Sequence, residues 1–305
     1  MTTLLSSFFP PSREQWQLLV WGFSFMPYVT GALWFRPVIL MGKNSVTSRL
    51  NINGRFGWFI MEVPGFITMW AVLFGVKQQL GIETLPRMNY LMATIYVRCD
   101  VTQLSERILI LQTIHYIYRS ILSPIFLAPS VSPMHVSVAA SAVVFNLVNG
   151  ASLGGWLGGY GPITNEYWSS RMILVQLGLG LWIAGFAGNI YHDDELRALR
   201  RKSAREQAAK AEKEGDKQKT SVKKIYKIPQ AGLFQYILYP HYFCEWFEWA
   251  GYWMIGGPSC VPAKSFLLNE IGTMLPQAVL GKKWYIEKFG KEKIGDRKAI
   301  IPCIL

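Results

Sequence analysis

Residues 172–190 read MILVQLGLGLWIAGFAGNI and contain no charged side chain. A helix needs about 20 mostly apolar residues to cross the hydrocarbon layer of a bilayer, and this stretch has that length and composition. The composition changes abruptly after this stretch, because residues 192–227 contain 12 Lys or Arg and 7 acidic residues. The two segments together predict a membrane-spanning helix followed by a charged, water-exposed connection.

The composition of the whole chain is typical of a membrane protein. Hydrophobic residues make up 51% of the 305 residues and charged residues 16%, whereas soluble domains carry about a quarter charged residues. The net charge is +12. The basic residues lie between apolar stretches, where they indicate orientation in a membrane rather than nucleic-acid binding. We therefore expect a membrane-embedded protein with no nucleic-acid partner.

Apolar stretches of similar length predict an all-α bundle of about seven transmembrane helices in a single membrane domain, residues 1–305. The last span is interrupted by Pro276, and residues 84–106 fit either a luminal loop or a short interfacial helix. Residues 150–161, with six glycines, predict a luminal loop after the fourth helix. The predicted spans are 16–35, 57–76, 108–127, 136–157, 172–190, 233–255 and 265–285.

Charge in the connections predicts the orientation of the bundle. Cytosolic loops carry an excess of Lys and Arg, so the charged loop at 192–230 is expected in the cytosol. Counting spans outward then places the N-terminus in the lumen and the C-terminus in the cytosol. We expect the membrane to be that of the endoplasmic reticulum. Four cysteines occur without a CxxC pair or a metal-type spacing, so we expect free, buried thiols: Cys99, Cys244, Cys260 and Cys303.

Ionisable side chains inside a span are costly and are functional candidates by default. Arg55, Trp58 and Glu62 are three and four residues apart, hence on one helix face. A desolvated Glu62 can donate a hydrogen bond or a proton, or it can form a structural ion pair with a neighbouring helix. In the third span, Tyr116 lies beside His115 and Arg119 and can donate to a substrate carbonyl, or it can belong to an interfacial aromatic belt.

Two further clusters flank the charged loop. Arg197 and Arg200, one turn apart after Asn189 and Asp193, suit a phosphate group or an ordinary basic helix end. The second cluster places His241, Glu245 and Glu248 on one side of a helix. No further ligands occur at matching spacing, so hydrogen bonding to a ribose or an amide is a better use of these carboxylates than a metal ion. There is no GxGxxG, GxxxxGK[ST] or HExxH motif, so a nucleotide would have to bind between membrane helices.

At these residues the sequence resembles the steroid 5α-reductase family, which also includes polyprenol reductases and very-long-chain enoyl-CoA reductases. The likeness runs from Gly42-Lys43 to the C-terminus, and it rests on the order and spacing of several short motifs. These are GRFGWF at 54–59 with Glu62, HY at 115–116 with Arg119, Asn189 with Asp193, YKIPQAGLF at 226–234, YFxE at 242–245 with EWxGY at 248–252, and KWY at 283–285 with RK at 297–298.

The resemblance implies a seven-helix bundle that encloses NADPH on its cytosolic side and reduces the C4–C5 double bond of a 3-oxo-Δ4 steroid or sterol intermediate from the bilayer. It assigns the 3-keto oxygen to Glu62 and Tyr116. The residues that it places around the cofactor are Trp58, Arg119, Asn189, Asp193, Arg200, Tyr226, Glu245 and Tyr285. We add their neighbours His115, Arg197 and His241 as further cofactor-binding candidates.

The chain departs from the steroid enzymes in three places. The family's cofactor phosphate-binding Asn and two Arg after Arg119 are replaced by Leu127, Ala128 and Ser130. Insertions lie near residues 84–104 and 200–224; the second could supply compensating cations. Reduction of a polyprenal-type or enoyl-CoA lipid therefore remains an alternative. An isoprenylcysteine-type methyltransferase is a more distant one, and a sterol-binding or scaffold protein would use the same polar clusters only to join helices.

Overall fold

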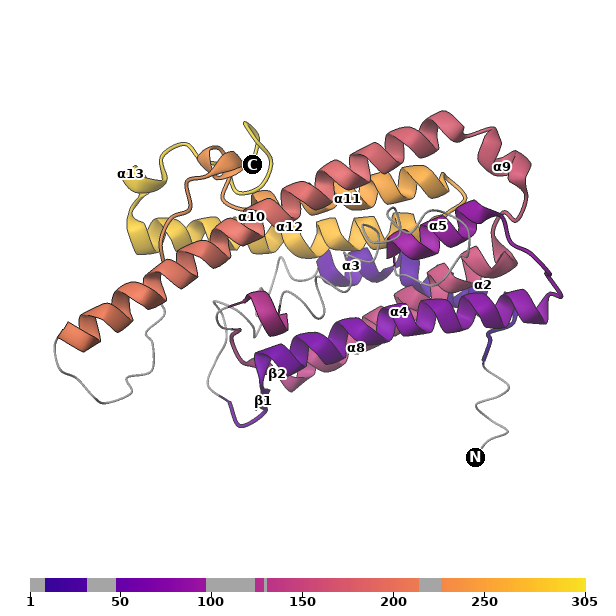
Figure 1. Ribbon diagram of the computed structural model, residues 1–305, viewed down its shortest axis with the longest axis horizontal. Coiled ribbons are helices and arrows are strands. Elements are labelled where there is room, and N and C mark those ends of the chain that lie inside the picture. The colour runs from indigo at the N-terminus through magenta and orange to yellow at the C-terminus, as the bar shows by residue number, and fades with distance from the viewer. Residues whose placement is uncertain (1–8, 32–47, 97–123, 129–130, 214–225) are drawn as a thin grey trace.

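The structure is a computed structural model, and it describes residues 9–31, 48–96, 124–128, 131–213 and 226–305. These residues are almost entirely helical, and the long helices run side by side (Figure 1). The helices are α2 Arg13–Ser24, α3 Met26–Gly31, α4 Gly54–Gln79, α5 Arg87–Tyr96, α8 Val136–Gly155, α9 Asn165–Ser169, α10 Met172–Lys213, α11 Pro240–Gly256, α12 Val261–Phe289 and α13 Lys291–Ile294.

Three helices in the described part of the chain are long and apolar enough to cross a membrane. They comprise residues 54–79, 136–160 and 172–209. Each contains one of the predicted spans, which confirms the helical class and these three stretches. The total of seven spans and the orientation of the termini stay predictions.

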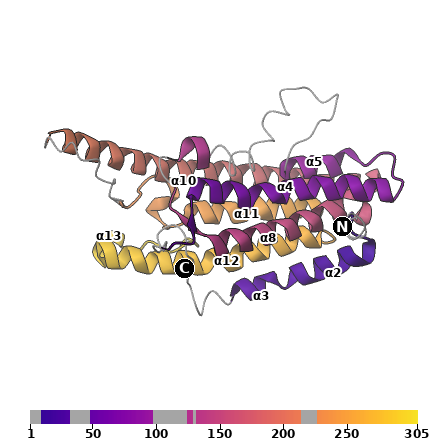
Figure 2. The same cartoon turned by 90° about the horizontal axis from the view of Figure 1, so that it is seen from below.

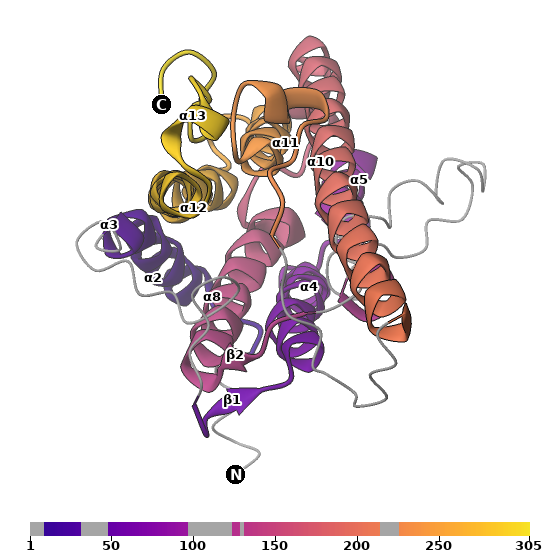
Figure 3. The ribbon, with the colours of Figure 1, turned by 90° about the vertical axis from the view of Figure 1, so that its left-hand side faces the viewer.

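Two helix pairs organise the bundle. α10 packs along α11 and α4 packs along α8, while α12 contacts α11, α2 and α3. Figure 2 shows most of these helices running lengthwise together, and the end-on view in Figure 3 shows α10 and α11 on one side and α4 and α8 on another. A two-residue antiparallel pairing of β1, Asn51–Ile52, with β2, Met134–His135, brings the starts of α4 and α8 together.

The glycine-rich stretch at 150–161, predicted as a loop, is mostly helical. α8 continues through Gly155, and a π-helical turn follows at Trp156–Tyr160. Gly150, Gly154 and Gly158 are four residues apart and face α4, where an added Cβ would strike backbone oxygens of that helix. Small residues at this spacing let two helix backbones approach closely, so the glycines serve packing rather than a turn.

Other predicted boundaries also change. The sixth span was expected from residue 233, but α11 begins at Pro240, which has no N–H and suits the first helical turn. The seventh was expected to break at Pro276, yet α12 runs through it, as apolar helices with neighbours can. The first part of the charged connection is continuous with the fifth span, because α10 is one helix of 42 residues.

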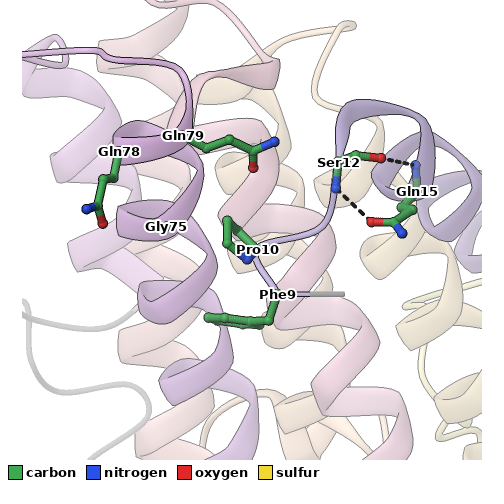
Figure 4. Close-up of a pocket in the computed structure, with 7 residues that line it drawn as sticks. All are labelled: Phe9, Pro10, Ser12, Gln15, Gly75, Gln78 and Gln79. Carbon is green, nitrogen blue, oxygen red and sulfur yellow. Dashed lines mark hydrogen bonds between the residues drawn. The ribbon is translucent and has the colours of Figure 1, made fainter. Parts of the chain in front are cut away.

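At the other end of the chain, the first span is divided into α2 and α3 around Phe25, and residues 32–35 lie outside the described residues. Ser12 and Gln15 form a reciprocal capping box that begins α2, and Pro10 lies against Gly75 of α4 (Figure 4). For residues 84–106 we predicted either a loop or a short helix. The described part of this segment contains a helix, α5.

Cysteine exposure follows the prediction at two positions and contradicts it at one. Cys244 and Cys260 are free and buried, whereas Cys303 is free but exposed near the C-terminus. Complete burial between α11 and α12 raises the pKa of the Cys260 thiol to about 12. Cys99 lies outside the described residues.

Candidate active site

The α10–α11 interface is built on glycine. An added Cβ on Gly185 would lie 2.6 Å from the Cys244 carbonyl oxygen and would also strike the backbone nitrogen of Glu248. Gly178 and Gly251 meet in the same way farther along the pair. Because the backbones are this close, a short polar side chain on α10 can reach across to α11.

Asn189 makes that crossing. Its Nδ2 donates to the backbone carbonyl of His241 at 3.1 Å and to Oε2 of Glu245 at 3.1 Å. Asn189 is 7% exposed, Glu245 3% and Glu248 0%. Two carboxyl groups one turn apart are therefore buried on α11, where a charged group needs partners. The structure thus brings together Asn189, His241 and Glu245 from the predicted set.

His192 is a further buried polar side chain at this interface, and the sequence reasoning did not select it. Its Nδ1 lies 2.6 Å from the carbonyl oxygen of Gly188, and its Nε2 accepts from the backbone N–H of Leu233 at 3.1 Å. A carbonyl can only accept, so Nδ1 carries the proton and Nε2 is the acceptor. No sequence motif signals this role, because the partner is a backbone group 41 residues away.

Residues 226–239, here called the Tyr226 loop, lead into α11 beside this interface. The Tyr226 ring meets Trp284 edge to face with centroids 4.9 Å apart, and Lys288 Nζ lies 4.6 Å from the centre of the Tyr226 ring. Tyr285 is buried and within electrostatic range of both Arg200 and Tyr226. Predicted cofactor residues from α10, the loop and α12 therefore gather at one end of the bundle.

The C-terminal segment holds the end of the Tyr226 loop. Lys298 N–H donates to the Tyr236 carbonyl at 2.8 Å, and Leu238 N–H donates to the Lys298 carbonyl at 2.9 Å. Tyr239 N–H donates to the Ala299 carbonyl at 3.0 Å, and Arg297 bonds the Gln230 side chain. The C-terminal segment that carries the RK motif at 297–298 therefore fixes the loop beside the site.

The two candidate phosphate-binding arginines differ in their surroundings. Arg197 is 4% exposed and pairs with Asp194, with Nε at 3.0 Å and an Nη at 2.9 Å from the same carboxylate oxygen. Arg200 is exposed. Asp193 is half-buried beside His192. A guanidinium already held by a carboxylate has fewer donors to offer, so Arg200 is the better phosphate ligand of the two.

Glu62 lies on the other helix pair. It is 7% exposed on α4, with Trp58 half-buried one turn before it. Glu62 is eight residues from the start of α4 and Glu245 five from the start of α11, which is about 12 and about 8 Å of helix rise. Both helices begin at the end of the bundle toward which α10 extends (Figure 1). Each acid therefore lies within about two turns of the start of its own helix.

Arg55, on the same face of α4, is bound to a short π-helical turn at 124–127. Its two Nη atoms donate to the carbonyls of Ile125 at 2.8 Å and Ala128 at 3.1 Å. Arg201 of α10 donates to the Leu127 carbonyl of the same turn at 3.3 Å. Cations from α4 and α10 thus converge where the resemblance had implied lost phosphate ligands. The predicted residues His115, Tyr116 and Arg119 lie outside the described residues.

Residues 132–305, more than half of the chain, match the family model described as 3-oxo-5-alpha-steroid 4-dehydrogenase. The chain belongs to this family. It is 37% identical over 269 residues to an uncharacterised protein of Schizosaccharomyces pombe, covering 87% of this chain and 89% of that protein. It is 26% identical over 268 residues to steroid 5-alpha-reductase DET2 of Solanum lycopersicum, covering 85% and 84%.

A human relative is similarly close. The chain is 27% identical over 268 residues to 3-oxo-5-alpha-steroid 4-dehydrogenase 1 of Homo sapiens, covering 86% of this chain and 85% of that protein. The matched model begins at residue 132, before β2, and so takes in α8 and every later element. It includes Asn189, His192 and Glu245, whereas Glu62 falls in the part matched by the longer pairwise comparisons.

Two open hollows lie at the opposite end of the bundle from this cluster. One, of about 410 Å³, is lined by Phe9, Pro10, Ser12, Gln15, Gly75, Gln78 and Gln79 (Figure 4). The other, of about 510 Å³, lies between residues 84–88 and 163–166. Neither hollow is lined by a predicted site residue. We therefore do not assign the reaction to either hollow.

Proposed function

We propose that the protein is an NADPH-dependent reductase that saturates the C4–C5 double bond of a 3-oxo-Δ4 steroid or sterol intermediate. The observation that carries the proposal is the buried polar cluster between α10 and α11 in a member of this family. Asn189, Glu245 and Glu248 are each less than 8% exposed in an apolar helix pair. Such groups are retained inside membrane helices when they serve binding or catalysis.

The proposed setting is the endoplasmic reticulum membrane, which the protein crosses about seven times with its N-terminus in the lumen and its C-terminus in the cytosol. The continuous α10 supports this placement. Its residues 172–190 carry no charge, and the same helix then continues as a basic segment with exposed Arg200, Arg201 and Arg205. A helix that leaves the hydrocarbon at a cluster of arginines fits a cytosolic exit.

The donor set around the cluster fits a dinucleotide. Buried carboxylates at Glu245 and Glu248 accept from ribose hydroxyls or an amide, while the exposed guanidinium of Arg200 suits a phosphate. We assign the remaining cofactor contacts to Trp58, His115, Arg119, Asn189, Asp193, Arg197, Tyr226, His241 and Tyr285. When bound, NADPH supplies the hydride for the reduction.

The chain's own chemical task is to hold the substrate carbonyl. Glu62 and Tyr116 are proposed to donate hydrogen bonds to the 3-keto oxygen, where negative charge develops as the double bond is reduced. Glu62 is buried, and we assign one of the two donated hydrogen bonds to its carboxyl group in the protonated form. Donors directed at developing charge are worth about 10²–10³ in rate. Asn189 fixes the orientation of the Glu245 carboxylate, so that the cofactor side of the site is preorganised.

Purified protein in detergent or nanodiscs tests the proposal. We expect consumption of NADPH with a 3-oxo-Δ4 steroid and formation of the 5α-reduced product by mass spectrometry. A panel that includes a polyprenal and an enoyl-CoA distinguishes the substrate classes. Protein that neither binds NADPH nor reduces any member of the panel would refute the proposal, and activity on another lipid alone would move it to that class.

A further inference from the structure

His192 is a buried titratable side chain that the proposed chemistry leaves unused. It is 4% exposed, and both ring nitrogens have partners: Gly188 O on its own helix and Leu233 N in the Tyr226 loop. It lies one turn beyond Asn189 on α10, and its Nδ1 is 3.9 Å from the Cys244 sulfur on α11. The ring therefore contacts α10, α11 and the loop together.

The loop is shaped to present its backbone to this ring. Gly232 has a φ of +56°, a conformation that favours glycine, and it directs the N–H of Leu233 at Nε2 of His192. An added Cβ on Gly232 would lie 2.9 Å from that nitrogen and 2.7 Å from the Tyr191 ring. Phe234, fully buried, then packs its ring against His192 with centroids 5.4 Å apart.

The contact lies midway along the Tyr226 loop. The end of the loop is held by backbone bonds to Lys298 and Ala299, and its start by an exposed ion pair of Lys227 with Glu206. Between them, His192 supplies a buried side-chain bond to the helix that carries Asn189. Buried hydrogen bonds of this kind resist competition from water, whereas an exposed ion pair contributes little.

We propose that His192 is a positioning residue for the cofactor: its Nε2 holds the Tyr226 loop on α10, so that Tyr226 stays beside Trp284 and Tyr285. The effect on the cofactor rests on the proposed function. The ring acts through the loop and touches neither substrate nor cofactor. Loss of the bond is expected to weaken NADPH binding while leaving the chemical step intact.

Two substitutions separate the two ring nitrogens. In His192→Asn, the amide nitrogen can still donate to Gly188 as Nδ1 does, but nothing reaches Leu233. In His192→Gln, the amide oxygen lies near the position of Nε2 and can accept from Leu233. A side chain that merely fills space would make the variants behave alike. The proposal requires His192→Asn to release the loop and His192→Gln to retain it.

Hydrogen–deuterium exchange of residues 226–239 without cofactor, together with steady-state kinetics, provides the test. We expect faster exchange and about a tenfold higher KM for NADPH in His192→Asn, at a kcat within about twofold of the parent, and near-parent values in His192→Gln. Gly232→Ala alters the contact from the loop side, and we expect it to behave like His192→Asn. If His192→Asn does not fold, Gly232→Ala provides the test of whether the His192–Leu233 contact holds the loop.

Equal exchange in His192→Asn and His192→Gln would overturn the proposal, as would a released loop with an unchanged KM for NADPH. The exchange measurement does not depend on activity. If the parent protein does not use NADPH, the proposed function fails, while exchange still shows whether His192 holds the loop.

Discussion

The two helix pairs of the bundle are packed by the same device but differ in what they bury. In the α4–α8 pair, Gly150 and Gly154 bring α8 against the backbone of α4, and in the α10–α11 pair Gly185 does the same for α11. The α4–α8 interface is mostly apolar and includes Asn146, which donates to the Met61 carbonyl at 2.6 Å. The α10–α11 interface ends in a cluster of amide and carboxyl groups.

This difference suggests a division of labour. Glycine packing alone explains the close approach in both pairs, so it indicates no function by itself. Buried acids are costly, and their distribution is therefore informative. One acid, Glu62, lies on α4 and is proposed to hold the substrate carbonyl, while Glu245 and Glu248 lie on α11, where Asn189 contacts Glu245. Substitution of Glu62 in α4 should change the chemical step, and substitutions in α10–α11 should change cofactor binding.

The largest expected effect comes from Glu62→Gln. The amide keeps the shape of the side chain but cannot act as an acid, so kcat should fall about 10²–10³-fold. Because Glu62 is assigned to the substrate carbonyl and not to the cofactor, the KM for NADPH should change by less than about twofold. Steady-state kinetics with NADPH titrated at saturating steroid measure both values. A kcat near that of the parent protein would exclude Glu62 from the mechanism. It would also contradict the proposed division of roles between the two helix pairs.

Gly185→Ala tests the other pair. Its new methyl group would meet the backbone of Cys244 and Glu248 and push α11 from Asn189. Overpacking of this kind costs about 1–3 kcal/mol, so we expect a lower unfolding temperature and about a tenfold higher KM for NADPH. Thermal unfolding and kinetics measure the two effects.

Two glycine controls make this result specific. Gly180, on the same helix, has nothing within 4 Å of an added Cβ, so Gly180→Ala should be neutral or slightly stabilising. Gly154→Ala, in the α4–α8 pair, should lower stability with a smaller rise in the KM for NADPH. Equal KM changes in Gly154→Ala and Gly185→Ala would show that the pairs do not divide the task.

Arg200→Ala is expected to have a smaller effect on the cofactor preference. If Arg200 binds the phosphate that distinguishes NADPH from NADH, the preference for NADPH should fall about tenfold. Competition between the two cofactors in the same assay measures it, with Arg205→Ala as a control at an exposed arginine farther along α10. An unchanged preference would exclude this assignment.

The smallest effect is expected for Lys227→Ala. This side chain reaches Glu206 at 2.6 Å, but both groups are substantially exposed, and exposed ion pairs are screened by solvent and salt. We expect a change in the KM for NADPH of less than about threefold. Comparison with His192→Asn then shows whether the buried attachment of the Tyr226 loop outweighs the exposed one.

Much of the helix layout was predictable because hydropathy acts locally. The apolar stretches at 57–76, 136–157 and 172–190 became α4, α8 and α10. Two errors had signals in the sequence. Glycines at 150, 154 and 158 recur every four residues, the spacing of a packed helix face, and Pro240 marks the first turn of α11.

The candidate site was predicted less completely. Asn189 and Glu245 were selected from the sequence, and the structure joins them by a hydrogen bond. His192 was not predicted because its partner is the backbone N–H of Leu233. Every residue except proline has such a group, so the residue type at position 233 gives no sign of the contact. The pairing of Arg197 with Asp194 is local, three residues apart, but the sequence analysis did not predict it.

The sequence alone determined where apolar helices form and which polar residues they carry, because length, hydropathy and the cost of buried charge act along a single segment. The tertiary structure decided which of those polar groups meet. Asn189 and Glu245 are 56 residues apart, and Leu233 is 41 residues from His192. Their contacts depend on how closely glycine lets α10 approach α11, and on the turn at Gly232. These are properties of packed backbones rather than of any one segment.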